Sequence, residues 1–167
     1  MSKPSQSRLN YSKRIGRACE ALFVLTAESL GFEVVKSSVS DDMTKHIDFY
    51  LFFDGRGGWG VDVKGKNKHD EIWCEFKNVK GNKGWMLGEA DIIAFDMPTS
   101  NGFCIVDRQE LLSFCLDFVS GEIVDNKHDA YGKTYTRTGR KDEITKIKMS
   151  DLEQLKSFRV WVYPSEK

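Results

Sequence analysis

The spacing of apolar residues predicts a long helix at the start of the chain. Over residues 7–30 the apolar side chains recur on one helical stripe, and Gly31 follows where a helix commonly ends. Six of the seven residues from 21 to 27 are apolar, so this half of the helix should pack on more than one side. Glu20 projects from the second of these faces, which places its carboxylate at the edge of the core or at a site.

Shorter apolar runs downstream predict strands, at 32–36, 45–53, 57–65, 72–79, 90–95, 102–106 and 159–163. A polar turn is expected over 37–42. The sequences that begin at Asp107 and Ser150 have the form of capping boxes and predict helices there. This order of elements predicts an α/β (α+β) fold in which helices flank one mixed sheet. Since neither a repeat nor a linker divides the sequence, a single domain over 1–167 is expected.

The composition agrees with a folded domain, because 40% of the residues are hydrophobic and 30% are charged. Such a chain has enough apolar material to exclude a disordered, collagen-like or coiled-coil protein. It contains no apolar run near the roughly 20 residues that a membrane helix needs, and no secretory signal is recognised. The chain is therefore expected to be intracellular and to have no membrane partner.

Lysine and arginine together number 25, as do aspartate and glutamate, but the charges are not evenly spread. Segments 1–20, 64–83 and 126–148 are basic, whereas 86–125 holds eight acids and only one basic residue. Separated blocks of this kind can present a basic face to a polyanion. Three solvated surfaces that face different ways would explain the same pattern.

The glycine-rich segment 55–60 fits the letters G-x-G-x-x-G of a dinucleotide site. That site requires a helix next, and the residues that follow, from Val61, predict a strand. A hairpin turn is therefore expected here, and the nucleotide interpretation is rejected.

Two aspartates and a lysine remain as candidate site residues. Asp48 stands inside an otherwise apolar run, where a carboxylate is costly unless it is paired or bound to metal. Asp62 and Lys64 are two residues apart on the next predicted strand, so they share a face, and Gly60 on that face leaves room for a close approach. Two carboxylates can hold Mg²⁺, and the lysine can orient a water or stabilise developing negative charge.

Two alternatives remain at this stage. The first is a buried Asp–Lys ion pair with the second aspartate in a turn, since Asp-x-Lys triplets are common by chance. The second is the rival triplet Glu75-Phe76-Lys77, whose strand alternates cleanly between apolar and polar positions. Solvated charges are the default for such a half-exposed strand.

The arrangement of Glu20 on a first helix, Asp48, and Asp62-x-Lys64 on successive strands resembles the PD-(D/E)XK, or restriction-endonuclease-like, nuclease superfamily. The run from Trp73 to Phe95 and the later segment Tyr135–Asp142 look like a family of phage endonucleases. Together these segments cover about residues 45–155.

The resemblance implies a Mg²⁺-dependent endodeoxyribonuclease, with Mn²⁺ as an alternative metal. Asp48, Asp62 and the main-chain carbonyl of Val63 would be metal ligands, Lys64 the catalytic lysine and Glu20 an auxiliary acid. The sequence departs from the superfamily in having Ile47 where a proline commonly precedes the first aspartate. It also continues in strands after Lys64, which leaves Glu75 and Lys77 as auxiliary candidates.

DNA is the expected partner, and the basic stretch 133–148 is expected to hold its backbone. Arg137, Arg140 and Lys141 lie there in a polar, glycine-containing segment, and arginine can grip phosphate through two parallel hydrogen bonds. The alternative is a solvated hairpin in which Arg140 or Lys141 pairs with a neighbouring acid. Cutting both strands of a duplex would favour a homodimer. A catalytically inactive nucleic-acid-binding module of the same fold is the alternative function.

Overall fold

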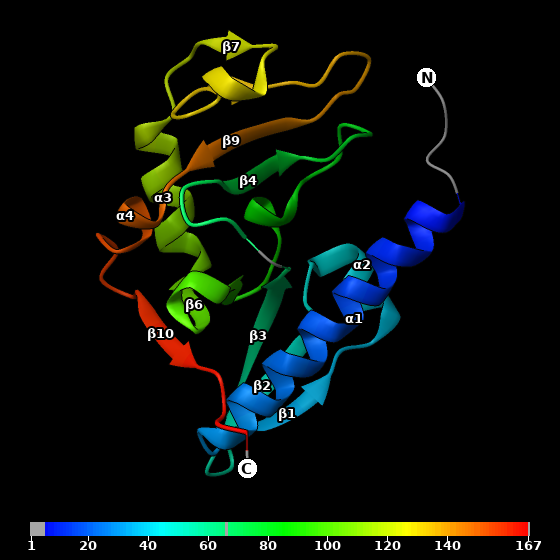
Figure 1. Ribbon diagram of the computed structural model, residues 1–167, viewed down its shortest axis with the longest axis vertical. Helices are drawn as coiled ribbons and strands as arrows, with labels where there is room; N and C mark the ends of the chain where they lie inside the picture. Colours follow the sequence, from blue (N-terminus) through cyan, green and yellow to red (C-terminus); the bar gives the residue numbers. More distant parts are fainter. Residues whose placement is uncertain (1–5, 66, 167) are drawn as a thin grey trace.

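The computed structural model describes residues 6–65 and 67–166, and the first five residues of the basic segment 1–20 lie outside this part. Two sheets and several helices make up the fold (Figure 1). The helices are α1 (Gln6–Ser29), α2 (Val39–Lys45), α3 (Arg108–Phe118) and α4 (Met149–Leu152), with short 3₁₀ turns η1 (Trp85–Leu87), η2 (Pro98–Ser100) and η3 (Lys127–Asp129).

The larger sheet has six strands in the order β1-β2-β3-β5-β6-β10. All neighbours are antiparallel except β3 and β5, which are parallel. The α/β fold class predicted from the sequence is therefore confirmed. The strands are β1 (Glu33–Lys36), β2 (Phe49–Phe53), β3 (Arg56–Lys64), β5 (Ile92–Met97), β6 (Gly102–Asp107) and β10 (Arg159–Val162).

The smaller sheet was not predicted. Its four strands follow the order β4-β9-β8-β7, so the segment 72–79 does not join the larger sheet as expected. The reason is that β4 pairs with β9, which lies in a region that the sequence pattern left as a loop. The strands are β4 (Ile72–Lys77), β7 (Ile123–Val124), β8 (Thr134–Tyr135) and β9 (Glu143–Ile147).

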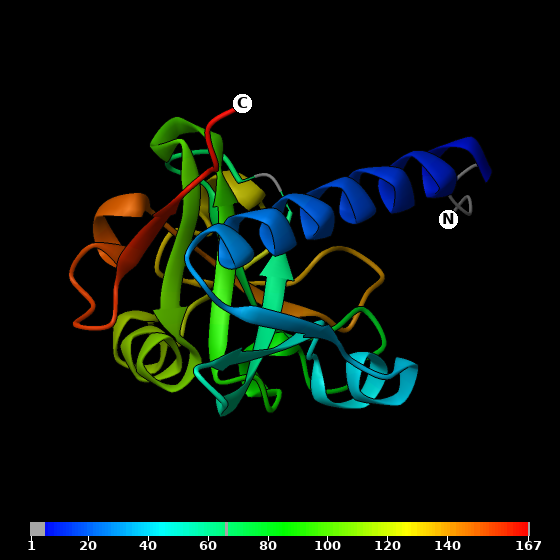
Figure 2. The ribbon, with the colours of Figure 1, turned by 90° about the horizontal axis from the view of Figure 1, so that it is seen from below.

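Helix α1 covers one face of the larger sheet. Its Phe23 packs against Phe49 and Phe103 with ring centroids 5.8 and 5.4 Å apart, and Val61 belongs to the same buried cluster. As predicted, Gly31 follows the helix in a left-handed conformation. Figure 2 shows the N-terminal turns of α1 extending past the rest of the molecule. The segment 21–27 packs on the sheet by one side only, since Phe23, Thr26 and Ala27 are buried while Leu25 is 57% exposed, so the expectation that this half packs on more than one side is wrong.

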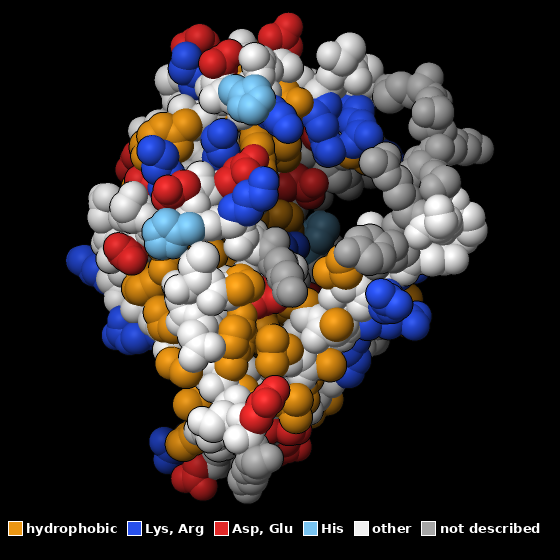
Figure 3. All heavy atoms as spheres, in the orientation of Figure 1, with side chains coloured by type: hydrophobic (Ala, Val, Ile, Leu, Met, Phe, Trp, Pro, Cys, Tyr) orange, Lys and Arg blue, Asp and Glu red, His pale blue; other side chains and the backbone are white. Residues whose placement is uncertain are grey.

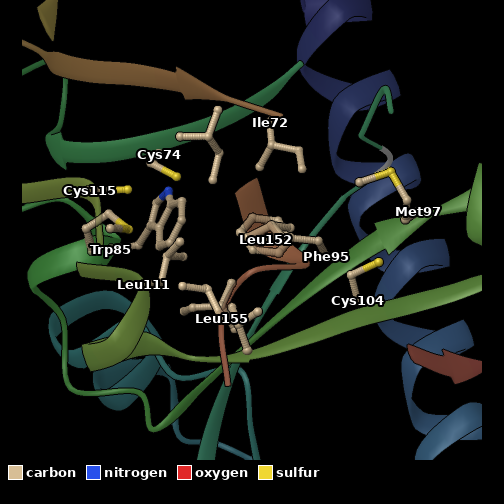
Figure 4. Packing of buried hydrophobic residues seen from close by; sticks show 14 of the residues in the cluster. Ile72, Cys74, Trp85, Phe95, Met97, Cys104, Leu111, Cys115, Leu152 and Leu155 are labelled. Atoms are coloured by element: carbon tan, nitrogen blue, oxygen red, sulfur yellow. The ribbon is translucent and has the colours of Figure 1, made fainter. Parts of the chain in front are cut away.

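The opposite face of the larger sheet packs on the smaller sheet and on α3. Cys74 and Trp85 lie in one cluster with Phe95 of β5 and Leu111 of α3 (Figure 4). Because this cluster contains buried residues from both sheets, it fixes the smaller sheet against β5 and β6 of the larger sheet. None of the helices in residues 6–65 and 67–166 combines the length and apolar content that crossing a membrane requires.

Local details correct several sequence expectations. Residues 39–45 form α2 rather than a turn, because the Ser38 hydroxyl accepts a hydrogen bond from the Asp41 N–H and starts a helix. Strand β2 begins only at Phe49, so Asp48 precedes the strand instead of lying inside it. The residue before α4 is Lys148 rather than Ser150, and its N–H donates to the carboxylate of Asp151.

Two other expectations are confirmed. Asp107 caps α3 by accepting a hydrogen bond from the Glu110 N–H. The glycine-rich segment is a hairpin: Asp54 and Gly55 take positive φ values of 50° and 69° between β2 and β3. Positive φ at both central residues is typical of a two-residue hairpin turn, and a strand rather than a helix follows it.

Candidate active site

Asp48 lies at the edge of β3, just before β2 begins. Its N–H donates to the Val61 carbonyl at 2.8 Å, and its Oδ2 accepts a hydrogen bond from the Val63 N–H at 2.7 Å. The side chain therefore extends the hydrogen-bond ladder of β3 by one position upstream of β2, where its carboxylate accepts from the Val63 N–H in place of a main-chain carbonyl. Since the N–H and C=O of one strand residue point to the same edge, the Val63 carbonyl also lies on the side of Asp48.

Asp62 and Lys64 share one face of β3, as the period-two pattern predicts. Lys64 Nζ lies 2.8 Å from Asp62 Oδ2, and the Asp62 side chain is only 6% exposed. The ammonium is not aligned as a hydrogen-bond donor, so Asp62 Oδ2 accepts no hydrogen bond from the described residues. A buried carboxylate oxygen that is paired by charge alone is a candidate for a further ligand.

The two carboxyl groups influence each other. Burial raises the pKa of Asp48 to about 6, and the charges of Asp62 and Glu20 add to the rise. Burial also raises the pKa of Asp62, while the charge of Lys64 lowers it. Two buried acids of this kind make the site unfavourable for negative charge, and a bound cation would relieve that cost.

Glu20 reaches this region from α1. Its Oε2 accepts a hydrogen bond from Lys36 Nζ at 2.8 Å, and the same ammonium lies 4.5 Å from the centre of the Phe49 ring. The charge of Glu20 contributes to the raised pKa of Asp48, so the two carboxyls are within electrostatic reach. The sequence pattern gave no reason to select Lys36, which the antiparallel pairing of Lys36 with Phe49 brings to the site.

The room expected at Gly60 is filled by the protein itself. A Cβ at this position would lie 2.9 Å from Ile47 Cδ1, so the glycine admits the neighbouring side chain and not a ligand. The Gly60 N–H donates to Asp91 Oδ2 at 2.8 Å, which ties β3 to the segment before β5.

The structure separates the two members of the rival triplet. Burial of the Glu75 carboxyl has the larger effect on its pKa and raises it, while the charge of Lys64 lowers that pKa. Glu75 thus lies within electrostatic reach of Lys64. Lys77 forms an exposed ion pair with Glu143 at 2.6 Å, beyond a register shift between Glu75 and Lys77. Glu75 therefore joins the surroundings of Lys64, whereas Lys77 faces away.

Trp85, to which the sequence pattern assigned no role, forms a wall of the site. Lys64 Nζ lies 4.8 Å from the centre of its ring. Buried Arg108 holds the turn that carries Trp85, because its guanidinium donates to the main-chain carbonyls of Ala90 and Met86. Gly84 allows the turn to lie on β4, since a Cβ there would be 2.4 Å from the Glu75 carbonyl oxygen.

The residues present suit a hard divalent cation. Asp48, Asp62 and the Val63 carbonyl offer only oxygen, which Mg²⁺ prefers, and Mg²⁺ commonly keeps several waters beside one or two carboxylates. Within the described ranges 6–65 and 67–166, no group of three or more His, Cys, Asp and Glu side chains is placed to hold a metal. The donor set therefore fits Mg²⁺ with waters, and it does not fit a metal that needs a full protein cage.

The basic residues predicted to hold DNA lie on the turn between β8 and β9. Arg137 donates through Nε to buried Asp142 at 2.5 Å, while Arg140 and Lys141 are exposed. The acid Glu143 pairs with Lys77, so neither acid is paired as the solvated-hairpin alternative expected. In Figure 3, Lys and Arg side chains gather on the upper part of this face, where Figure 1 places the loops that follow β4 and β8.

Comparisons with models of known protein families, with curated proteins and with solved structures found no match to this chain.

Proposed function

We propose that the protein is a metal-dependent DNA endonuclease that hydrolyses phosphodiester bonds beside β2 and β3. The observation that supports this most strongly is the group formed by Asp48, Asp62 and Lys64: two buried carboxyls whose pKa values are raised by burial, with an ammonium 2.8 Å from one of them. Their placement, with Asp48 just before β2 and with Asp62 and Lys64 on β3, agrees with the resemblance to PD-(D/E)XK nucleases drawn from the sequence.

Asp48, Asp62 and the Val63 carbonyl would hold Mg²⁺ or Mn²⁺, and Glu20 would be an auxiliary acid that binds a metal-bound water. When bound, the metal lowers the pKa of a water and offsets negative charge on a phosphate oxygen. Lys64 would donate to the attacking water or to the phosphate, where negative charge develops during the reaction. Trp85 beneath the ammonium limits the positions that Lys64 can take.

The exposed residues Arg140 and Lys141 would hold the DNA backbone, with Arg137 beside them. We propose that the protein acts inside the cell, in the cytoplasm of the host cell if a phage encodes it. Cleavage of both strands of a duplex would call for two active sites and favour a homodimer.

A catalytically inactive binding module is the second candidate. The observation that favours it is the absence, within the described ranges, of a group of three metal-holding side chains. Against it stands the cost of keeping two adjacent buried carboxyls, which a retired site has no reason to retain.

One assay distinguishes the two functions. Supercoiled plasmid, linear duplex and single-stranded DNA are each incubated with the protein in Mg²⁺, Mn²⁺ or EDTA. The endonuclease proposal predicts nicked or shortened products with Mg²⁺ or Mn²⁺ and none in EDTA. Retarded but intact DNA under all three conditions would support the binding module instead.

A further inference from the structure

A pocket of about 450 Å³ opens beside the candidate catalytic lysine. Trp85 belongs to its lining and also lies under Lys64, so the pocket adjoins the candidate active site at this ring. Glu75 lines it as well, and the charge of Lys64 acts on the Glu75 carboxyl. None of the roles assigned above to Asp48, Asp62 and Lys64 uses this space.

Two aromatic rings form one wall of the pocket. Trp73 of β4 and Tyr135 of β8 both line it, and their ring centroids are 5.8 Å apart with the planes tilted by 43°. Both residues are half-buried. Because the rings contact each other, a flat ligand would stack on this wall and would not fit between the two rings.

Cations surround the aromatic wall. Lys127 and Arg137 line the pocket, and Lys146 Nζ lies 5.5 Å from the centre of the Trp73 ring. Asp142 holds the Arg137 guanidinium through Nε, which fixes its orientation and leaves its other N–H groups to donate. Aromatic faces combined with lysine and arginine are the means by which proteins bind unpaired bases and the phosphates that flank them.

The acids of the pocket add selectivity. Glu71 pairs with Lys68 at 3.3 Å, whereas Glu75 is half-buried and held among Lys64, His46 and Arg137 by their charges. A carboxylate in such a place can accept hydrogen bonds from the exocyclic amino group of a base. It would disfavour a purely anionic ligand such as free phosphate.

We propose that this pocket takes one unpaired nucleobase of the DNA substrate, stacked on Trp73 and Tyr135, with its flanking phosphates held by Lys127 and Arg137. This inference rests on the proposed endonuclease function and narrows its substrate to DNA that is single-stranded or locally unpaired at the cut. A base in an intact duplex would have to leave its stack to enter the pocket.

The test measures binding apart from cleavage. The wild-type chain in EDTA is titrated into a single-stranded oligonucleotide of about 12 thymidines, within the range of known single-strand sites. The oligonucleotide carries one 2-aminopurine, whose fluorescence falls when it stacks on an aromatic ring. Duplex DNA of the same length serves as competitor.

Three variants give the matched comparison. Trp73→Ala should weaken binding roughly tenfold or more, which is typical of losing one base–aromatic stack, and should abolish the fluorescence quenching. Trp73→Phe should restore most of both, because a ring remains. Trp59→Ala, which removes an exposed tryptophan that does not line the pocket, should bind like wild type. Tyr135→Ala gives a second test if Trp73→Ala does not fold.

Equal affinity and equal quenching in wild type, Trp73→Ala and Tyr135→Ala would overturn the inference. So would a wild-type chain that binds duplex as tightly as the single strand. If DNA is still cut in Mg²⁺ after either of these results, the endonuclease proposal stands without the pocket. If binding depends on the aromatic wall but no DNA is cut in any metal, the pocket stands and the endonuclease proposal fails.

Discussion

The main-chain N–H of Val63 donates to Asp48 Oδ2 at 2.7 Å, so a side chain takes the ladder position that a main-chain carbonyl upstream of β2 would otherwise fill. This bond holds one carboxyl at the edge of β3, while Asp62 projects from a face of the same strand one residue away. The cost is visible in the raised pKa of both acids, whose largest cause is burial. The metal-free protein should therefore be less stable than a variant in which one of these two acids is replaced by a neutral residue of the same size.

Asp48→Asn should stabilise the metal-free protein at neutral pH. The folded pKa of about 6 lies above the unfolded value, so the contribution of Asp48 to stability is greatest below pH 3.8 and is lost as the pH rises through 6. The amide oxygen of Asn can still accept from the Val63 N–H. We expect the variant to be on the order of 1–3 kcal/mol more stable at pH 7.5 in EDTA, by denaturant unfolding.

The pH dependence provides the control for this substitution. The difference between Asp48→Asn and wild type should shrink as the pH falls from 7 to below 4, because the wild-type carboxyl becomes neutral. If the variant is clearly less stable than wild type at pH 7.5 in EDTA, the ionised Asp48 carboxylate does not destabilise the metal-free protein, and its role as a metal ligand is contradicted.

Mg²⁺ should raise the melting temperature of the wild-type chain more at pH 7.5 than at pH 5. The cation competes with a proton on Asp48, whose pKa is raised to about 6, so binding weakens as that group is protonated. Differential scanning fluorimetry with and without Mg²⁺ measures the effect. An equal shift at both pH values, or an undiminished shift in Asp48→Asn, would place the cation elsewhere.

Lys64→Ala and Lys77→Ala should behave differently. Loss of Lys64 leaves buried Asp62 without its cation, so we expect a loss of about 3–5 kcal/mol in EDTA, partial recovery in Mg²⁺, and no DNA cleavage. Loss of Lys77 removes an exposed pair with Glu143, worth up to about 1 kcal/mol, and should leave cleavage near wild type. The opposite ranking of cleavage rates would move the site to Asp62, Glu75 and Lys77.

The strands of the larger sheet could be predicted because each follows from a local apolar run. The placement of β4 could not, since its partner β9 has only Thr145 and Ile147 fully buried and pairs with it across about half of the chain. Helix α2 was missed for a related reason: it has no buried residue and so no apolar stripe, and only its Ser38 cap marks its start.

The candidate site also combines features that follow from local sequence patterns with features that depend on long-range packing. The shared face of Asp62 and Lys64 follows from the two-residue period of a strand, and Asp48 stood out as a charge in an apolar run. The approach of Glu75 and Trp85 to Lys64 depends on how the smaller sheet folds back against β3. That is a tertiary relationship, which no local pattern in the sequence encodes.

The exposed turn between β8 and β9 should contribute to DNA affinity through charge. Replacing Arg140 and Lys141 with alanine should flatten the slope of log affinity against log salt by about two units if each neutralises one phosphate. Because Asp142 already neutralises Arg137, adding Arg137→Ala should change the slope by less than a further unit. Fluorescence anisotropy in EDTA over a range of salt concentrations measures the slope.

The control is a matched pair of charges on another part of the surface. Lys156 and Arg159 are exposed, near α4 and β10, and their replacement with alanine should leave the slope unchanged. If the two double variants alter the slope equally, the turn between β8 and β9 has no special role in binding.

The most direct test of the central proposal compares plasmid cleavage by wild type and by Asp62→Asn. The substitution removes the charge of the most buried candidate ligand with little change in volume, and Asp117→Asn, at an exposed position on α3, is the matched control. We predict that wild type and Asp117→Asn nick supercoiled plasmid in Mg²⁺ and not in EDTA, while folded Asp62→Asn cuts under neither condition. Cleavage by equally pure Asp62→Asn at the wild-type rate would contradict the assignment of the site.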